Sequence, residues 1–172
     1  MDHERVAVDI GLEILEDNPH ATFLHADMRQ PDTILRNPTT TSMLDFTEPI
    51  AMLWGSMLHF IDDRDDLFGI FDRYKELLKP GDHIALSHVT WHFVNDNRAE
   101  QTRSGLDAYN ERVNENLSVR DLDSIMRFFH GTEIADPGVV PLPDCKPDVP
   151  NHQADHSTLG RTMVVGGVGG LR

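Results

Sequence analysis

The sequence predicts an α/β fold with a mainly parallel sheet, because apolar segments of strand length alternate with segments of helical periodicity. Two features support this prediction. The segment Pro49–Leu58 is apolar on both faces, as is typical of a buried parallel strand. Asp66–Lys79 carries apolar residues at three- and four-residue spacing, as a helix packed on a sheet does. The length of 172 residues suits a single domain spanning residues 1–172, without an internal repeat.

Each predicted strand is a short apolar segment bounded by turn residues. The strands expected are Thr22–Met28, Pro49–Met57, His83–Val89, a short one at Glu133–Ala135, and Thr162–Val168. Glycines dominate residues 166–170, but too few residues follow them to form a phosphate-binding helix. We therefore expect that stretch to be a frayed C-terminal strand end.

The predicted helices are Arg5–Glu16, Asp66–Lys79, Ser118–His130 and a weaker one at Asp96–Asn116. Pro80-Gly81 ends the second helix, and Ser118 with Asp121 resembles a capping box at the start of the third. Five apolar residues of the first helix should face inward: Val6, Ala7, Ile10, Ile14 and Leu15. The proline-rich segment Pro137–His156 is expected to be a long surface loop.

The charge of the chain bears on its partners. Asp+Glu number 29 and Lys+Arg 15, which gives a net charge of −14. Such a surface repels phosphate backbones and anionic lipids, so we expect neither nucleic acid nor membrane as a partner. The chain has one cysteine, Cys145, and residues Met1–Asp17 lack the apolar region of a signal peptide. A reducing, cytoplasmic location fits these features.

Neither acidic clusters nor histidine pairs predict a metal site. His88 and His92 have a four-residue spacing, but they follow a strand rather than lie on a helix. Four aspartates, at 62, 63, 65 and 66, directly precede a predicted helix. Carboxylates at that place cap exposed N–H groups and favour the helix dipole, so we prefer capping to cation binding.

The order of several short motifs resembles a known family. These motifs are HADMRQP at residues 25–31, LDFTEPIA at 44–51, LHFIDD at 58–63, PGDHIALSH at 80–88, RFFHG at 127–131 and PGVV at 137–140. Their succession is similar to that of actinobacterial S-adenosylmethionine-dependent methyltransferases once known only as a domain of unknown function. The resemblance runs from Met1 to about Val168. It implies a Rossmann-like methyltransferase sheet with an antiparallel last strand, the cofactor S-adenosyl-L-methionine, and a small-molecule methyl acceptor.

The resemblance also assigns five cofactor-binding residues. Asp2 would hold the ribose hydroxyls, Asp27 would accept from the exocyclic amine of adenine, and Met28 would pack on the adenine ring. Ser56 and His59, at the end of the family's fourth strand, would line the methionine moiety. Two alternatives remain open: Asp2 as an unstructured terminal residue, and Asp27 as a turn or capping residue.

Methyl transfer asks little of side chains beyond positioning and desolvation, with a base where the nucleophile must lose a proton. His88 and His92, beyond the fifth strand, are the candidate catalytic bases. Trp91 and Phe93 would bind an apolar acceptor, and Tyr109 would close over it as part of a lid. The alternative for these residues is packing or solvation.

One departure from the family concerns the start of the chain. Family members carry a first strand, a Gly-rich turn and a helix before the position of Met1, and the resemblance implies a sheet lacking that strand and that Gly-rich loop. In the strand order 3-2-1-4-5-7-6 the first strand is central. Its absence would expose an edge of Pro49–Met57, which favours self-association and weakens cofactor binding. We therefore expect Met1 to be a misassigned start.

Three functions follow as hypotheses. The first is methyl transfer by a protein longer than this chain, with activity impaired in the truncated form. The second is a noncatalytic remnant that does not bind the cofactor. The third is another Rossmann-type enzyme, such as a dehydrogenase.

Overall fold

The computed structural model describes residues 1–94, 117–145 and 162–172. The chain forms two compact units, each described here by itself. Unit 1 comprises Met1–Glu48 and Asp66–Leu77, and unit 2 comprises Pro49–Asp65 and Leu78–Arg172. The predicted helix Asp96–Asn116, with Tyr109, and the later part of the loop Pro137–His156 lie outside the described residues. A single domain over residues 1–172 stays a prediction.

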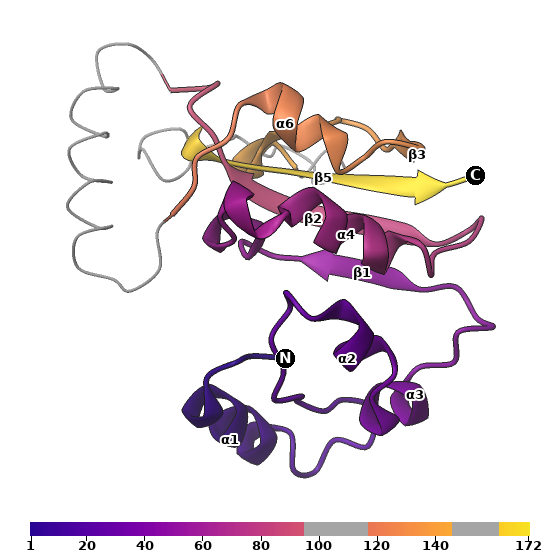
Figure 1. Cartoon of the computed structure of the whole chain (residues 1–172). Helices are drawn as coiled ribbons and strands as arrows, with labels where there is room; N and C mark the ends of the chain where they lie inside the picture. The colour runs from indigo at the N-terminus through magenta and orange to yellow at the C-terminus, as the bar shows by residue number, and fades with distance from the viewer. Residues whose placement is uncertain (95–116, 146–161) are drawn as a thin grey trace. The chain divides into compact units, whose positions relative to one another are not determined.

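Unit 2 is built on a five-stranded sheet (Figure 1). Its strands run in the order β1-β2-β5-β3, and β4 also pairs with β5. β1 is parallel to β2, whereas β5 is antiparallel to β2, β3 and β4. Four strands therefore share one direction and the last strand of the chain is reversed, which confirms the predicted sheet. The strands are β1 (Ala51–Trp54), β2 (His83–Val89), β3 (Thr132–Ile134), β4 (Val140–Pro141) and β5 (Val164–Leu171).

Several of the predicted strands need correction. β5 covers Val164–Leu171 rather than Thr162–Val168, and β3 covers Thr132–Ile134 rather than Glu133–Ala135. β2 has the predicted bounds, but the strand expected at Pro49–Met57 is shorter, because β1 ends at Trp54 and Ser56 turns the backbone to a φ of 53°. Thr22–Met28 is not a strand. It forms an isolated parallel bridge between His25 and Asp2, because the short segment at Asp2 offers it no longer ladder.

The glycines of β5 have a structural role that the sequence analysis missed. Residues 166–170 are not a frayed end, because they pair along their length with β2. A Cβ on Gly169 would lie 2.3 Å from Oγ1 of Thr132, and one on Gly167 would lie 2.9 Å from Cγ2 of Val139. Glycine at these positions therefore lets the segments around β3 and β4 approach β5 closely.

One helix in each unit begins at an aspartate cap. In unit 1, α4 (Leu67–Lys75) begins after Asp66, whose carboxylate accepts from the N–H of Gly69 at 3.3 Å. The predicted capping role is thus confirmed for Asp66. In unit 2, α6 (Leu122–Arg127) begins after Asp121, which accepts from the N–H of Ser124 at 2.6 Å. The helix does not begin at Ser118, where the sequence predicts its start. The backbone N–H of Ser118 donates to the carbonyl of His59.

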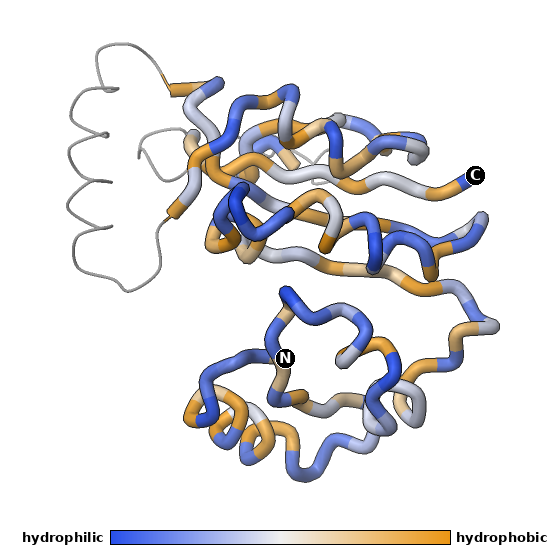
Figure 2. The backbone as a smooth tube through the Cα atoms, in the orientation of Figure 1, coloured by the Kyte–Doolittle hydropathy of each residue, from blue (hydrophilic) through white to orange (hydrophobic). Residues whose placement is uncertain are grey.

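The first helix of unit 1, α1 (Arg5–Ile14), presents a different face from the one predicted. Val6, Ile10 and Ile14 are 70%, 53% and 76% exposed, so the prediction that they face inward is wrong. The buried residues are Val8 and Gly11. The ring of Phe23 packs so closely on Gly11 that an added Cβ would lie 2.4 Å from it. Figure 2 shows the alternation of hydrophobic and hydrophilic residues along α1.

The rest of unit 1 contains two short helices, α2 (Pro31–Leu35) and α3 (Pro38–Met43). The helix α4 contacts α2 and the segment that precedes α2. Arg73 of α4 forms an ion pair with Asp32 of α2, with 2.6 Å between Nη2 and Oδ1. The hydroxyl of Tyr74 donates to the carbonyl of Met28 at 2.8 Å. These contacts anchor the residues that precede α2.

At the outer edge of the sheet, β1 pairs with β2 and has no second partner strand among the described residues. Leu53, on this edge strand, is 76% exposed.

Within the described part of the chain, the helices fall short of the length and hydropathy that a membrane crossing requires.

Asp82 joins the starts of the two parallel strands of unit 2. Its carboxylate is buried and accepts from the N–H of Ile50 and from that of Lys79, each at 2.8 Å. Its carbonyl accepts from the N–H of Leu171 at the end of β5. Burial raises the pKa of Asp82, but the two N–H donors and the nearby positive charges outweigh it, so the pKa lies below its ordinary value.

We predict that Asp82→Ala lowers the free energy of unfolding by about 2–3 kcal/mol, because two buried N–H groups lose a charged acceptor. Urea denaturation measures this change. The matched control Asp72→Ala, at an exposed position of α4, should change stability by less than about 0.5 kcal/mol. Equal stability of the two variants would contradict the role given to Asp82.

Candidate functional site

In unit 1, Asp2 and Asp27 lie on two neighbouring segments that run in parallel. The N–H of Asp2 donates to the carbonyl of Leu24 at 3.0 Å, and the N–H of Ala26 donates to the carbonyl of Asp2 at 2.9 Å. The side chain of Asp2 accepts from the N–H of Glu4 and stays about one-third exposed. The structure thus brings together the residues that the resemblance placed at the ends of two adjacent strands.

The carboxylate of Asp27 is occupied by Arg29. Oδ1 accepts from the backbone N–H and from Nε of Arg29, and Oδ2 accepts from Nε and Nη2, at 2.7–3.0 Å. The side-chain hydrogen bond from Arg29 is the main cause that lowers the pKa of Asp27. A carboxylate has about four lone-pair positions, and three N–H groups of Arg29 occupy most of them. The geometry is that of the turn alternative, and an adenine amine could bind here only after Arg29 moves.

In unit 2, Ser56 occupies a strained position just beyond β1. Its φ of 53° lies in the left-handed region, which a residue other than glycine seldom adopts. The N–H of Ser56 donates to Oγ of Ser87 on β2 at 2.9 Å, and the two Oγ atoms lie 3.1 Å apart. Such strain is often found at ligand-binding turns. The turn therefore links the carboxyl ends of the two parallel strands.

His59 lies next along the chain, in the short 3₁₀ helix η1 (Leu58–Phe60). Its side chain is 4% exposed, and its Nδ1 is buried without a hydrogen-bond partner among the described residues. The ring meets that of His88 edge-on, with centroids 5.4 Å apart. Burial lowers the pKa of His59 to about 4, and the charge of Arg120 adds to this effect. His59 is therefore neutral at physiological pH.

His88 is enclosed in unit 2, and both of its ring nitrogens are occupied. Nε2 lies 2.9 Å from Nη1 of Arg120, and Nδ1 lies 2.8 Å from the carbonyl oxygen of Val89. Because a guanidinium only donates, Nε2 accepts, and the ring proton on Nδ1 is donated to Val89. Burial is the main cause that lowers the pKa of His88 to about 4. This geometry does not support the expected role of His88 as a base that contacts the acceptor.

His92, the second candidate base, is exposed. Its N–H donates to Oγ1 of Thr90 at 3.2 Å, and its ring meets that of Phe93 edge-on, with centroids 4.8 Å apart. Trp91 is half-buried and Phe93 is exposed beside it. The side chain of His92 is thus accessible to solvent.

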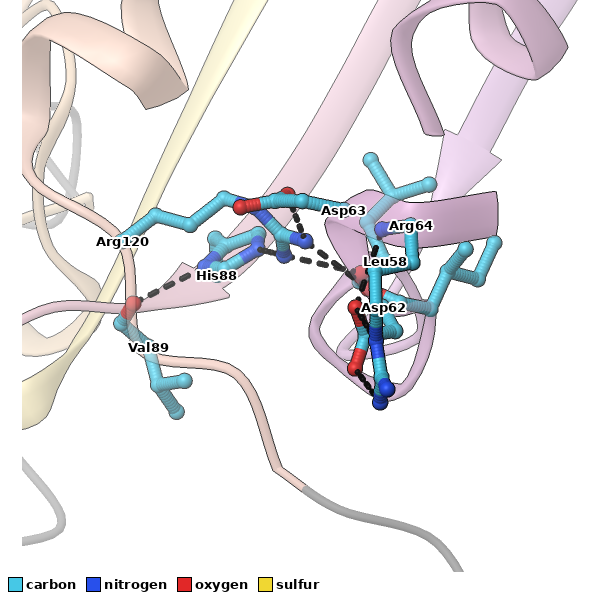
Figure 3. A network of polar contacts seen from close by, with 8 residues as sticks. Leu58, Asp62, Asp63, Arg64, His88, Val89 and Arg120 are labelled. Carbon is cyan, nitrogen blue, oxygen red and sulfur yellow. Dashed lines mark hydrogen bonds and ion pairs between the residues drawn. The ribbon is translucent and has the colours of Figure 1, made fainter. Parts of the chain in front are cut away.

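Arg120 is the centre of a polar network that the sequence analysis missed (Figure 3). The residue is 5% exposed and lies just before α6. Nη1 donates to the carbonyl of Leu58 at 3.1 Å and to His88, and Nη2 donates to the carbonyl of Ile61 at 2.8 Å. Nε and Nη2 both donate to Oδ1 of Asp63, at 3.1 and 2.7 Å. These acceptors match the five N–H groups of a guanidinium.

Local sequence patterns contain little indication of this network. An arginine beside a predicted helix cap normally lies in solvent, so nothing marked Arg120. Ser87 is a polar residue near the carboxyl end of β2, a strand that the sequence does predict. That placement is the signal by which Ser87 could have been found. Both residues act through contacts with segments far away in sequence.

Three carboxylates of the acidic group, those of Asp62, Asp63 and Asp66, have protein partners. In unit 2, Asp62 pairs with Arg64 at 2.7 Å and Asp63 with Arg120 at 2.7 Å. Within the described residues, no three His, Cys, Asp or Glu side chains are grouped as a metal site requires.

The sheet and the strand ends define the class of protein. The sheet is Rossmann-like, because its strands alternate along the chain with helices and its last strand is reversed. In folds of this kind, ligands bind beyond the carboxyl ends of the parallel strands.

Comparisons with known proteins identify the family. Residues 1–172 match the family described as S-adenosyl methyltransferase, and the chain belongs to that family. The predicted resemblance and the expected cofactor are therefore confirmed at the level of the family. No curated protein matches the chain.

Solved structures of similar proteins support the same family. A DUF574 family protein from Streptomyces avermitilis has a TM-score of 0.84 and 27% identity, covering 99% of this chain and 63% of its own. A putative methyltransferase from Thermobifida fusca has a TM-score of 0.83 and 25% identity, covering 99% of this chain and 61% of its own. The N-methyltransferase NodS of Bradyrhizobium japonicum, solved with S-adenosyl-L-homocysteine, covers 99% of this chain and 64% of its own; its TM-score of 0.56 and identity of 11% show the fold alone. The chain thus spans less than two-thirds of these structures.

The two buried histidines predict a pH dependence of stability. Above pH 6.5, His59 and His88 are neutral in both the folded and the unfolded chain. Between pH 6.5 and about 4, the unfolded chain binds protons that the folded rings do not. The free energy of unfolding should therefore fall as the pH falls, by up to about 1.4 kcal/mol per pH unit for each histidine.

Urea denaturation at several pH values measures this slope. We expect a folded His88→Asn variant to lose about half of it, whereas the exposed control His20→Gln should keep it. A slope that is the same in all three proteins would contradict the assignment of a buried, neutral His88.

Proposed function

We propose that this chain belongs to a protein that transfers the methyl group of S-adenosyl-L-methionine to a small-molecule acceptor. Family membership supports the reaction class. The observation that carries the proposal for this chain is the buried, unpartnered Nδ1 of His59 beyond the end of β1. A buried polar atom without a partner is rare in a native protein and is explained when a ligand completes it.

The residues after β1 fit the methionine part of the cofactor. Nδ1 of His59 would bond a polar group of that moiety, and the turn at Ser56 would place backbone close to it. When bound, S-adenosyl-L-methionine supplies a methyl group on a sulfonium, which an acceptor nucleophile attacks in line. Positioning and exclusion of water by these residues would provide most of the rate.

The residues of unit 1 fit the adenosine part unequally. Asp2 is partly exposed, and its carboxylate is suited to accept from two ribose hydroxyls. Met28 is half-buried and offers an apolar surface for the adenine ring. Asp27 fits only if Arg29 releases it, so its contact with the adenine amine depends on a rearrangement.

The proton of the acceptor would pass to His92. That histidine is exposed beyond β2, whereas the ring nitrogens of His88 are both occupied. Trp91 and Phe93 would bind an apolar or aromatic acceptor beside it. The net charge of −14 favours a small molecule over nucleic acid or membrane as the partner, and with the single cysteine it fits a cytoplasmic protein.

Calorimetric titration with S-adenosyl-L-homocysteine separates this function from its alternative, a noncatalytic remnant. We expect measurable but weak binding by the chain and no binding of NADH. The weakness follows from the edge of β1, which has no second partner strand among the described residues. Absence of S-adenosyl-L-homocysteine binding would favour the remnant, and binding of NADH instead would favour a dehydrogenase.

For Asp27 we predict that Asp27→Ala weakens S-adenosyl-L-homocysteine binding by about 1–3 kcal/mol, the cost of losing a buried hydrogen-bond partner. The same titration measures it, with Asp9→Ala on the exposed face of α1 as the control. Unchanged affinity in a folded Asp27→Ala variant would show that Asp27 serves the turn alone.

The open edge of β1 predicts self-association of the chain. An exposed, apolar edge strand is a template for pairing, and a lysine on it disfavours such pairing. We expect sedimentation velocity to show concentration-dependent oligomers for the wild-type chain and fewer for Leu53→Lys. A wild-type chain that stays monomeric at all concentrations would refute this proposal.

A further inference from the structure

Three peptide groups in the segment that follows β1 are held by one short stretch of chain before α6. The carbonyls of Leu58 and Ile61 accept from the guanidinium of Arg120, and the carbonyl of His59 accepts from the N–H of Ser118 at 2.7 Å. The stretch is itself fixed to β2, because the N–H of Arg120 donates to the carbonyl of Val89 at 3.3 Å. The positions of His59 and Phe60 therefore depend on Arg120.

The same guanidinium also sets the state of His88. Its Nη1 donates to Nε2 of that ring, so the ring proton stays on Nδ1. The His88 ring then lies between His59, which meets it edge-on, and Phe128, which stacks on it with centroids 6.3 Å apart. Arg120 thus fixes one wall of the space around His59 as well as the backbone that carries His59.

All five N–H groups of Arg120 are used within the protein, so none is left for a ligand. The side chain of Arg120 is 4% exposed, whereas that of its ion-pair partner Asp63 is 73% exposed. The two carbonyls and the imidazole supply the other three acceptors. Burying a guanidinium costs desolvation free energy, and a buried cation whose N–H groups are all hydrogen-bonded holds its acceptors in one conformation.

We propose that Arg120 is a positioning residue of the S-adenosyl site, which holds Leu58–Asp63 and the neutral His88 ring in the conformation that receives the methionine end of the ligand (Figure 3). This inference rests on the proposed function. It assigns to Arg120 an effect on ligand affinity through His59, without contact between Arg120 and the ligand.

The test compares Arg120→Met and Arg120→Lys with a control, Arg64→Met. Lysine keeps the charge but has three N–H donors instead of five, so it cannot serve all the acceptors. Arg64 is a neighbouring arginine whose side chain is 84% exposed and pairs with Asp62. Calorimetry with S-adenosyl-L-homocysteine measures affinity, thermal denaturation verifies folding, and ¹⁵N NMR of the histidine rings reports the tautomer of His88.

We expect Arg120→Met and Arg120→Lys to bind the ligand about 10- to 100-fold more weakly, because the ligand loses its hydrogen bond with the displaced His59 ring. The His88 ring should lose its fixed Nδ1–H tautomer in Arg120→Met, and Arg64→Met should resemble the wild-type chain in both measurements. Wild-type affinity together with an unchanged His88 tautomer in a folded Arg120 variant would overturn the proposal. If Arg120→Met does not fold, the affinity of Arg120→Lys decides, and wild-type affinity in that variant overturns the proposal.

Failure of the proposed function is distinguishable. If the wild-type chain does not bind the ligand, that function fails and with it the effect on affinity. The NMR comparison then still decides whether Arg120 fixes His88, because it needs no ligand.

Discussion

The hydrogen bonds of the Arg120 guanidinium connect the end of β2 with the segment after β1, and the candidate site of unit 2 depends on them. A buried guanidinium is stable only when its donors are matched, and here two carbonyls, a carboxylate and an imidazole match them. Because the acceptors come from distant parts of the sequence, this contact fixes the mutual position of segments that short-range propensities leave undetermined.

The three histidines near this contact show how environment separates residues of one type. His59 and His88 are enclosed and neutral, and the second has no free ring nitrogen. His92 follows the same strand but is exposed, whereas both ring nitrogens of His88 are occupied. In a methyltransferase the enclosed pair would shape the pocket, while proton transfer would fall to the open one.

Local patterns predicted the parts of the fold whose cause is local. The apolar run of β2 and the helix α4 with its aspartate cap were predictable because their signals lie within the segments themselves. The inward face of α1 was not, because the choice depends on Phe23 packing against Gly11. The same holds for Thr22–Met28, which lacks a long partner strand among the described residues. Of the candidate site, the strand ends could be predicted, but Arg120 could not.

Hydrogen exchange of the backbone amides, with and without S-adenosyl-L-homocysteine, tests the central claim most directly. The N–H groups of Phe60 and Ile61 close the turn of η1, so they report on the segment that the ligand is proposed to contact. If the ligand binds as proposed, exchange should slow at Ser56–Ile61 and at Asp2–Met28 when ligand is added, with little change in α6. Unchanged exchange in Ser56–Ile61, up to the solubility limit of the ligand, would show that the ligand does not contact this segment.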